Sequence, residues 1–184
     1  MKIKEVLDRH KKWIDGKGGE CGNLECADMQ EFNFDSLDLQ DINMNRSNLK
    51  FSRFVNANLK NANLSKVSFE HADFENANLE NADLSGADLS NANLKGANLK
   101  NANLNNARIT NVIGNDVEIH SFAFMDYNIV YTDTELQIGC VRRLIGEWFS
   151  FSDRQILEMD GKKALVFWKE CKPVLQKIFK IEND

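Results

Sequence analysis

The hydrophobic positions of this chain recur every five residues over much of its length. From Leu24 onward one large apolar residue marks the centre of each group of five, and the series runs without a slip to Ile109. A small residue, usually alanine, stands two positions before the centre, with asparagine or aspartate between them, as in Ala57-Asn58-Leu59. A period of five fits neither the helical period of about 3.6 residues nor the strand period of about 2. The pattern therefore predicts a repeat architecture in which each five-residue unit contributes the same local structure.

The repeated motif, A-(D/N)-L-x-x, resembles that of the pentapeptide repeat family, and the resemblance covers residues 20–111. It implies an all-β solenoid, a right-handed quadrilateral β-helix in which four pentads form one coil. The central and small residues of each pentad would point into a narrow interior, where small side chains are needed because a large one at every inward position would not fit. Ten central residues are the predicted structural core: Leu24, Phe34, Leu49, Phe54, Leu64, Phe69, Phe74, Leu84, Leu94 and Leu104.

With four pentads in a coil, residues 20 apart lie in one column, and successive coils stack about 4.8 Å apart. Phe34, Phe54 and Phe74 fall in one such column and are predicted to form an internal aromatic ladder. The bulky Ile42 lies in a column with Gly22, so large volume in one coil is offset by small volume in its neighbour. Asparagine and aspartate suit the corners because they tolerate unusual backbone angles and cap turns with their side chains.

Both ends of the repeat change pattern. Past Ile109 the frame continues in degenerate form, so we place the β-helix over 20–131, with a wider closing coil at its end. In residues 1–19, apolar residues from Ile3 to Ile14 share one helical face and predict an N-terminal capping helix. A solenoid needs such caps because its open edges would otherwise invite aggregation.

Residues 132–184 are predicted to be helical. The apolar spacing over 136–148 is that of one helical stripe, and Ser152-x-x-Gln155 has the form of a capping box at the start of a second helix. Gly161 is expected to end that second helix, and Pro173 to kink the last helix or begin a new segment. The tail also resembles the C-terminal tails of phage-type pentapeptide repeat proteins.

Two roles remain open for this helical tail, and they are compatible. It can cap the last coil, or it can form a homodimer through its apolar helices. The side chains proposed for a partner or dimer surface are all large and apolar: Trp148, Phe151, Phe167, Trp168, Leu175 and Phe179.

Charge is distributed in bands along the repeat. Residues 20–41 carry seven acids and no base, 42–69 five bases and no acid, 70–94 six acids and no base, 95–109 three bases, and 110–131 three acids. Opposite charges in the same column, such as Lys50 and Glu70, are predicted to pair between adjacent coils. Quinolone-resistance members of the resembled family mimic DNA and bind type II topoisomerases. A DNA mimic should present long acidic columns, and basic residues interrupt them here.

The remaining chemistry favours a non-catalytic protein. No phosphate-binding loop, dinucleotide-binding glycine motif, nucleophile elbow or metal-ligand spacing occurs, so we expect no enzyme activity, no cofactor and no metal. The four cysteines are expected to be free thiols, and the net charge of −5 gives no reason to expect direct nucleic-acid binding. Without a signal peptide or an apolar span, we expect a soluble cytoplasmic protein that does not enter membranes. The leading hypothesis is an interaction or scaffold protein with an unknown protein partner; the alternative is a DNA-mimicking modulator of a type II topoisomerase.

Overall fold

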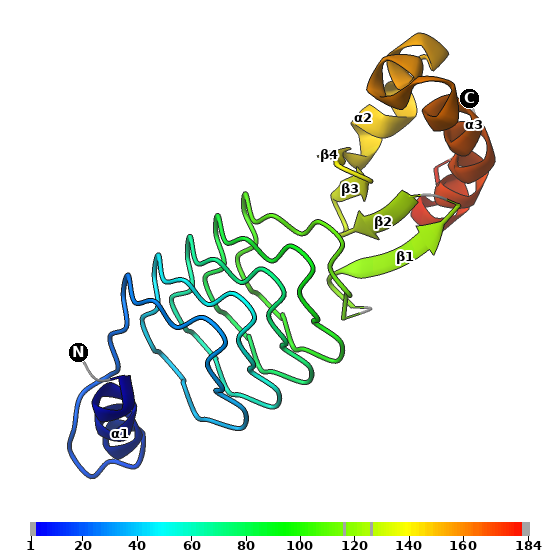
Figure 1. Cartoon of the computed structure of the whole chain (residues 1–184). Helices are drawn as coiled ribbons and strands as arrows, with labels where there is room; N and C mark the ends of the chain where they lie inside the picture. Colours follow the sequence, from blue (N-terminus) through cyan, green and yellow to red (C-terminus); the bar gives the residue numbers. More distant parts are fainter. Residues whose placement is uncertain (1–2, 116, 126, 182–184) are drawn as a thin grey trace. The chain divides into compact units, whose positions relative to one another are not determined.

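The computed structural model describes residues 3–115, 117–125 and 127–181 and divides the chain into two compact units. The repeat unit, Met1–Ser121, contains helix α1 (Ile3–Ile14) and the stacked coils (Figure 1). The C-terminal unit, Phe122–Asp184, contains the sheet and the two other helices. Strand β1 (His120–Phe124) begins at the end of the first unit and continues into the second.

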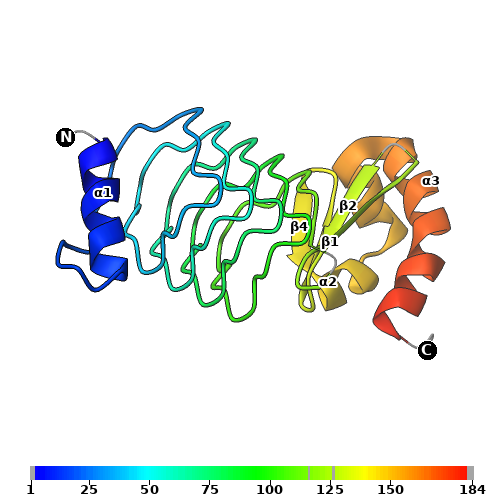
Figure 2. The ribbon, with the colours of Figure 1, turned by 90° about the horizontal axis from the view of Figure 1, so that it is seen from below.

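The coils are held together by a backbone hydrogen-bond ladder that repeats once per coil. Parallel bridges join the residue before each pentad centre to its equivalent four pentads later, from Asn23–Asn43 at the first coil to Asn93–Ile113 at the last. The contacts are short: the N–H of Leu24 donates to the carbonyl of Asn43 at 2.7 Å. Four pentads therefore make one turn of a four-sided coil, and Figure 2 shows these coils stacked one beside another.

Every corner of the coil places one residue in the left-handed backbone region. The residue two after each centre has φ between +54° and +61° at all non-glycine corners from Cys26 to Asn111. Asparagine is the commonest residue at these corners, and it adopts this conformation more readily than most residues. A second set of asparagines precedes the centres, where most of the side chains cap their own turn; the N–H of Glu80, for example, donates to Asn78 Oδ1 at 3.2 Å, while Oδ1 of Asn48 is an exception. These two positions hold 18 of the 20 asparagines between residues 20 and 111.

The interior of the coils is apolar and closely packed. Nine of the ten predicted core side chains are fully buried, while Leu104 is half-buried because it lies in the last coil, with no further coil stacked on it. The rings of Phe34, Phe54 and Phe74 stack nearly parallel, with centroids 4.7 and 4.9 Å apart, which matches the spacing of hydrogen-bonded strands. The predicted aromatic ladder is confirmed.

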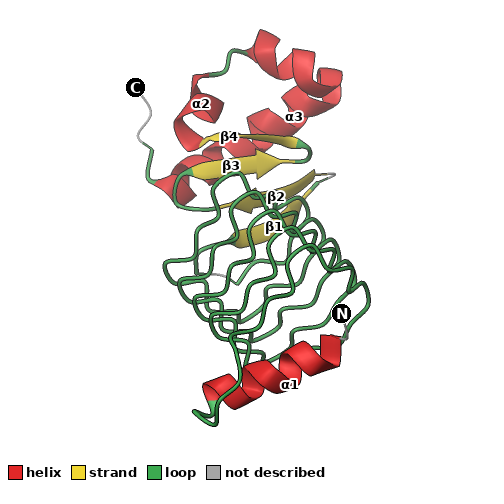
Figure 3. Ribbon diagram, turned by 90° about the vertical axis from the view of Figure 1, so that its left-hand side faces the viewer, coloured by secondary structure: helices red, strands yellow, loops and turns green. Residues whose placement is uncertain are grey.

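Helix α1 covers the N-terminal end of the coils (Figure 3). Its buried residues are Val6 and His10, and the Nδ1 atom of His10 accepts a hydrogen bond from the N–H of Gly22 at 2.9 Å. Gly19 lets the chain turn back tightly, since a Cβ there would lie 2.3 Å from the carbonyl oxygen of Arg9. A side chain of the capping helix, His10, thus accepts the hydrogen bond of a backbone N–H at the open end of the first coil.

The contact between His10 and Gly22 predicts a pH-dependent cap. Burial lowers the pKa of His10, and the nearby carboxylates of Asp38 and Asp41 offset only part of this effect. The neutral ring is therefore favoured in the folded state, and its contribution to stability is present above pH 6.5 and is lost as the pH falls from there toward the lower folded-state pKa. Protonation would also place an N–H where Nδ1 now accepts one.

This prediction can be measured by urea unfolding of the wild type and of His10→Gln at pH 7.5 and pH 5.0. We expect the wild type to lose more unfolding free energy on acidification than the variant, whose amide oxygen can accept the same hydrogen bond without titrating. An equal loss in both proteins would contradict a role for His10 titration.

The ladder ends earlier than the sequence pattern predicts. After Ile113 the side chain of Asn115 turns the chain: Oδ1 accepts the N–H groups of Glu118 and Ile119, and Nδ2 donates to the carbonyl of Ala97. Gly114 allows a close approach here, since an added Cβ would lie 2.1 Å from the carbonyl oxygen of Ile119. The prediction of a coil continuing to residue 131 is wrong, and the boundary between units lies at 121–122.

A four-stranded sheet follows, in the order β1-β2-β3-β4. Strands β2 (Tyr127–Tyr131), β3 (Glu135–Ile138) and β4 (Val141–Leu144) pair antiparallel, with Ile129 opposite Ile138 and Leu136 opposite Arg143. The predicted helical stripe over 136–148 is wrong in its first part. Gly139, at φ +58°, makes the turn between two short strands, so apolar residues that looked helically spaced lie on neighbouring strands instead.

Helices α2 (Ile145–Ser150) and α3 (Asp153–Phe179) complete the C-terminal unit. The predicted capping box is present: the N–H of Ser152 donates to Gln155 Oε1 at 3.0 Å, and the Ser152 side chain accepts from the N–H of Gln155. The helix breaks at the position predicted from the presence of Gly161. Asp160 and Gly161 both have non-helical backbone angles. The helix continues through Pro173 without such a break, so the prediction that Pro173 begins a new segment is wrong. None of the described helices is both long and apolar enough to cross a membrane.

Candidate functional site

The outer surface of the coils consists largely of polar side chains that bind one another along the stack. On the face that includes Asp38, the amide of Asn58 donates to the Asp38 carboxylate at 2.8 Å, and the amides of Asn78 and Asn98 continue the series at 3.1 and 3.0 Å. A parallel ladder runs through Asp41 and Asn61. Because these groups satisfy each other, the face is a regular and well-ordered polar surface.

Charged side chains pair between coils in the same way. Four of the predicted pairs are present: Lys50–Glu70 at 2.8 Å, Arg53–Asp73 at 3.3 Å, Lys60–Glu80 at 3.1 Å and Asp88–Arg108 at 3.6 Å. Arg53 also contacts Asp35 at 3.1 Å. Exposed pairs of this type contribute about 0–1 kcal/mol each, so their main effect is to neutralise the faces locally. Two acids of the last predicted band, Asp116 and Asp126, lie outside the described residues.

Several large apolar side chains are exposed on the repeat unit, among them Leu37, Ile113 and the aromatic Phe51. Phe51 is 53% exposed, and its ring stacks on the imidazole of His71 in the next coil, with centroids 5.0 Å apart and planes within 4°. Lys50 and Glu70, the preceding residues in the same two coils, form the ion pair described above. Phe51 and His71, which we name the aromatic corner, therefore form a flat platform beside a neutralised pair of charges.

The backbone conformation at Phe51 is unfavourable for the stability of the fold. Phe51 has φ +58°, a left-handed conformation that costs an L-residue with a bulky side chain roughly 1–2 kcal/mol. Equivalent corners are mostly asparagine, glycine or another polar residue, which are better suited to the angle or to water. An exposed phenylalanine in a disfavoured conformation is poorly explained by stability, and this marks the aromatic corner as the candidate interaction site.

Sequence analysis did not identify the aromatic corner. The available signal was a phenylalanine at an outward x position of the motif, directly after the polar Lys50. Its significance depends on the left-handed angle at that position and on His71 lying at the equivalent position of the next coil, and both follow only from the coil geometry.

The proposed partner surface of the C-terminal unit is corrected by the structure. Trp148, Phe167, Trp168 and Leu175 are buried in the core of their own unit, and Phe151 and Phe179 are partly buried against it. The Trp148 indole N–H donates to the carbonyl of Leu136 at 2.7 Å, and its ring lies 5.6 Å from that of Trp168. These side chains hold helices and sheet together, so they are not a free surface for dimerisation.

The cysteines are free, as predicted, and only Cys171 is buried. Burial raises the pKa of its thiol to about 11, which keeps it protonated and unreactive at neutral pH. Within the part of the chain that the structure describes, no three histidine, cysteine, aspartate or glutamate side chains come together in a way that could hold a metal ion.

Comparison with known proteins identifies the repeats. Residues 42–81, 52–91 and 77–113 match the sequence family described as pentapeptide repeats, with eight copies of the repeat. Pentapeptide repeat proteins fold as right-handed quadrilateral β-helices, and the coil of four pentads agrees with that description. No protein of curated function matches the sequence.

Several solved structures of pentapeptide repeat proteins are similar to the chain. HetL, involved in heterocyst differentiation regulation in the cyanobacterium Nostoc, is 28% identical over 55% of this chain and 52% of its own, with a TM-score of 0.39. A protein from the Arabidopsis thaliana thylakoid lumen is 38% identical over 48% and 59%, with a TM-score of 0.36. Full-length QnrB1, a plasmid-mediated fluoroquinolone resistance protein, is 20% identical over 56% and 64%, with a TM-score of 0.24. The chain spans only about half to three fifths of the first two.

Proposed function

Since this chain belongs to the pentapeptide repeat family through residues 42–113, we propose that it is a non-catalytic interaction protein whose coils act as a rigid scaffold. The aromatic corner is the part of the scaffold that contacts a protein partner. Its carrying observation is Phe51, an exposed aromatic ring in a left-handed conformation on a largely polar surface; the exposed Leu37 and Ile113 have no such backbone angle. Aromatic residues, phenylalanine included, are enriched at the cores of protein interfaces, and a preorganised ring contributes without a further loss of conformational freedom.

The neighbouring side chains support this role. The stacking of Phe51 on His71 holds the ring flat against the coil, and the Lys50–Glu70 pair provides polar contacts at its edge. An apolar centre with a polar rim is the usual anatomy of a protein interface. The partner surface that fits is therefore an apolar patch bordered by hydrogen-bonding groups.

Phe51→Asn tests the proposal because it installs the commonest residue at equivalent corners. The immobilised wild-type protein and variant are compared for capture of proteins from a lysate of the organism that carries them, followed by quantification of each captured species. We expect the variant to retain its fold and to lose about tenfold or more of the specific capture, as removal of an interface anchor does.

Arg46→Asn is the matched control. Arg46 is also a non-asparagine corner with φ +59°, but it lies on another face of the coil, so the substitution changes the backbone preference in the same way without touching Phe51. We expect its capture to equal that of the wild type. Full capture by Phe51→Asn, or equal loss in both variants, would contradict the assignment of the aromatic corner.

Mimicry of DNA is the weaker of the two proposals for this chain. Its support is the acidic stretch 20–41 in the first coil. Against it, Arg53 bridges Asp35 and Asp73, and Lys60 pairs with Glu80, so acidic groups along the coils alternate with bases that neutralise them. Double-stranded DNA instead presents one negative charge per roughly 1.7 Å without interruption.

A further inference from the structure

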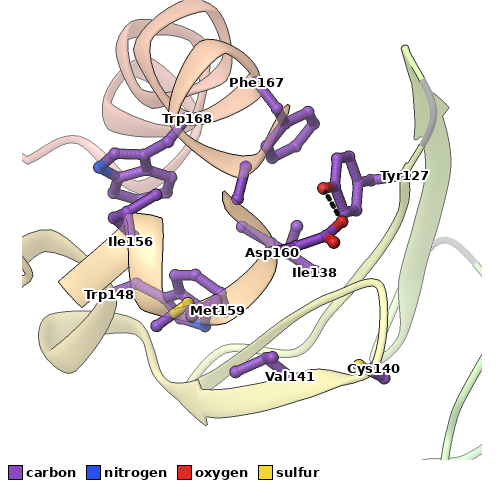
Figure 4. Close-up of a pocket in the computed structure, with 11 residues that line it drawn as sticks. Tyr127, Ile138, Cys140, Val141, Trp148, Ile156, Met159, Asp160, Phe167 and Trp168 are labelled. Atoms are coloured by element: carbon purple, nitrogen blue, oxygen red, sulfur yellow. Dashed lines mark hydrogen bonds between the residues drawn. The ribbon is translucent and has the colours of Figure 1, made fainter. Parts of the chain in front are cut away.

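The C-terminal unit encloses an apolar cavity of about 250 Å³ between the sheet and the two parts of helix α3 (Figure 4). Its deep walls are the buried side chains of Trp148, Ile156, Phe167 and Trp168. The residues toward solvent are Tyr127, Cys140 and Asp160, which are partly or fully exposed. Pockets for drug-sized ligands measure roughly 300–1,000 Å³, so this cavity suits a smaller body such as a single aromatic ring.

A carboxylate stands at the mouth of this apolar cavity. Tyr127 Oη donates to Asp160 Oδ2 at 2.5 Å, which fixes the orientation of the carboxylate (Figure 4). Asp160 reaches this place because α3 breaks there: Gly161 has φ +61° and ψ −151°, a combination that only glycine adopts readily. The helix break therefore delivers one acidic group to the rim of the cavity.

The aromatic walls also favour a positive charge. The Trp148 indole N–H is already bonded to the carbonyl of Leu136, so its ring presents an apolar π surface to the cavity. Tyr127 packs against Phe167 with centroids 4.5 Å apart, and Lys163 Nζ lies 5.4 Å from the centroid of the Tyr127 ring. A cation thus already packs against a ring at the mouth, within the distance of a cation–π contact.

We propose that this cavity binds a small organic amine, with an aromatic or branched apolar body against the walls formed by Trp148, Phe167 and Trp168 and its ammonium group on Asp160. Burial of the apolar body of the amine is favourable because it removes apolar surface from water. The ammonium group keeps a charged partner in Asp160 and lies near the π faces of the aromatic rings. This assignment is independent of the aromatic corner of the repeat unit.

The test is NMR titration of the full chain with 2-phenylethylamine and with 2-phenylethanol, its neutral analogue of nearly equal size. The indole N–H signals of Trp148 and Trp168 report the cavity, and that of Trp13 in helix α1 is an internal control. We expect the amine to shift the two cavity signals with a Kd of about 0.1–1 mM, a range within the limits of ligand efficiency for so small a molecule. The alcohol should bind about tenfold or more weakly, because it lacks the charge-assisted contact.

Three variants test whether amine binding depends on Asp160 and on the open volume of the cavity. Asp160→Asn can still accept from Tyr127, and it should weaken amine binding about tenfold, to the level of the alcohol. Glu158→Gln removes an exposed charge two residues away, which pairs with Arg154, and should leave amine binding unchanged. Ala164→Leu places a larger side chain on the cavity wall and should abolish binding of both compounds. Unmoved cavity signals up to about 10 mM amine, or equal affinities for amine and alcohol, would overturn the proposal.

Discussion

Truncation of Phe54 to alanine is expected to lower the unfolding free energy by about 3–5 kcal/mol, the range of large core truncations. The side chain has no exposed surface, and it stacks on Phe34 and Phe74 in the adjacent coils. It also meets the edge of Phe69, with centroids 5.8 Å apart. Alanine would leave a cavity in a narrow interior whose neighbouring coils are fixed by backbone hydrogen bonds and cannot collapse onto it. Urea unfolding monitored by circular dichroism gives the measurement.

Phe51→Ala is the matched control, because it removes the same ring from the same coil at an exposed position. Phe51→Ala should change the unfolding free energy by no more than about 1 kcal/mol. Since typical domains have only about 5–15 kcal/mol of stability, Phe54→Ala could fail to fold, and Phe54→Leu then serves instead. Leucine is the commonest residue at pentad centres, and Phe54→Leu should lower the unfolding free energy by about 1 kcal/mol. A loss below about 1 kcal/mol for Phe54→Ala would contradict the stacked interior.

Trp168→Ala is expected to destabilise the C-terminal unit by about 3–5 kcal/mol. Trp168 is buried in α3 and packs against Trp148 and Phe149 of α2, with ring centroids 5.6 and 5.7 Å away. Its removal takes away the contact that joins the two helices. The measurement is the helical circular dichroism signal during urea unfolding.

The control for this variant is Val166→Ala, at a 55% exposed position of the same helix, which should change stability by about 0.5 kcal/mol or less. If Trp168 instead faced a dimer partner, as the sequence suggested, its truncation would lower the stability of the isolated chain little. It would then act on a concentration-dependent association. That result would restore the original interpretation and contradict the core described here.

The repeat could be predicted from sequence because each pentad repeats one local constraint. The burial of Phe54 and the ladder through Phe34 and Phe74 follow from a period of five and a coil of four pentads. The tolerance of asparagine for left-handed angles at corners such as Asn56 is likewise a property of the residue type. Where every unit repeats the same local structure, the sequence pattern is enough to predict the fold.

The segment after Ile113 could not be predicted in this way. Apolar residues at 117, 119, 127 and 129 preserve the frame of five, but Gly114 and Asn115 bring the chain back on itself and end the ladder. The spacing from Leu136 onward fits a helix as well as two short strands, and the turn at Gly139 decides between them. Short apolar runs are ambiguous by periodicity alone, and tertiary pairing determines the outcome.

The candidate sites were missed for the same reason. Phe51 and His71 lie one full coil apart, and Tyr127 and Asp160 are separated by two strands and a helix, so neither pair forms a sequence motif. Their significance depends on geometry: a left-handed angle beneath an exposed ring in one case, and a glycine-dependent helix break in the other.

We propose that Phe51 serves contact with a partner, at a cost to folding. The unfolding free energy of Phe51→Asn compared with the wild type tests this directly. Asparagine relieves a left-handed cost of roughly 1–2 kcal/mol and gives up a ring contact of about 0.5–1.5 kcal/mol. We therefore expect Phe51→Asn to leave the unfolding free energy unchanged or to raise it by up to about 1 kcal/mol. A loss greater than about 1 kcal/mol would show that the ring serves the fold, and it would contradict the proposed interaction site.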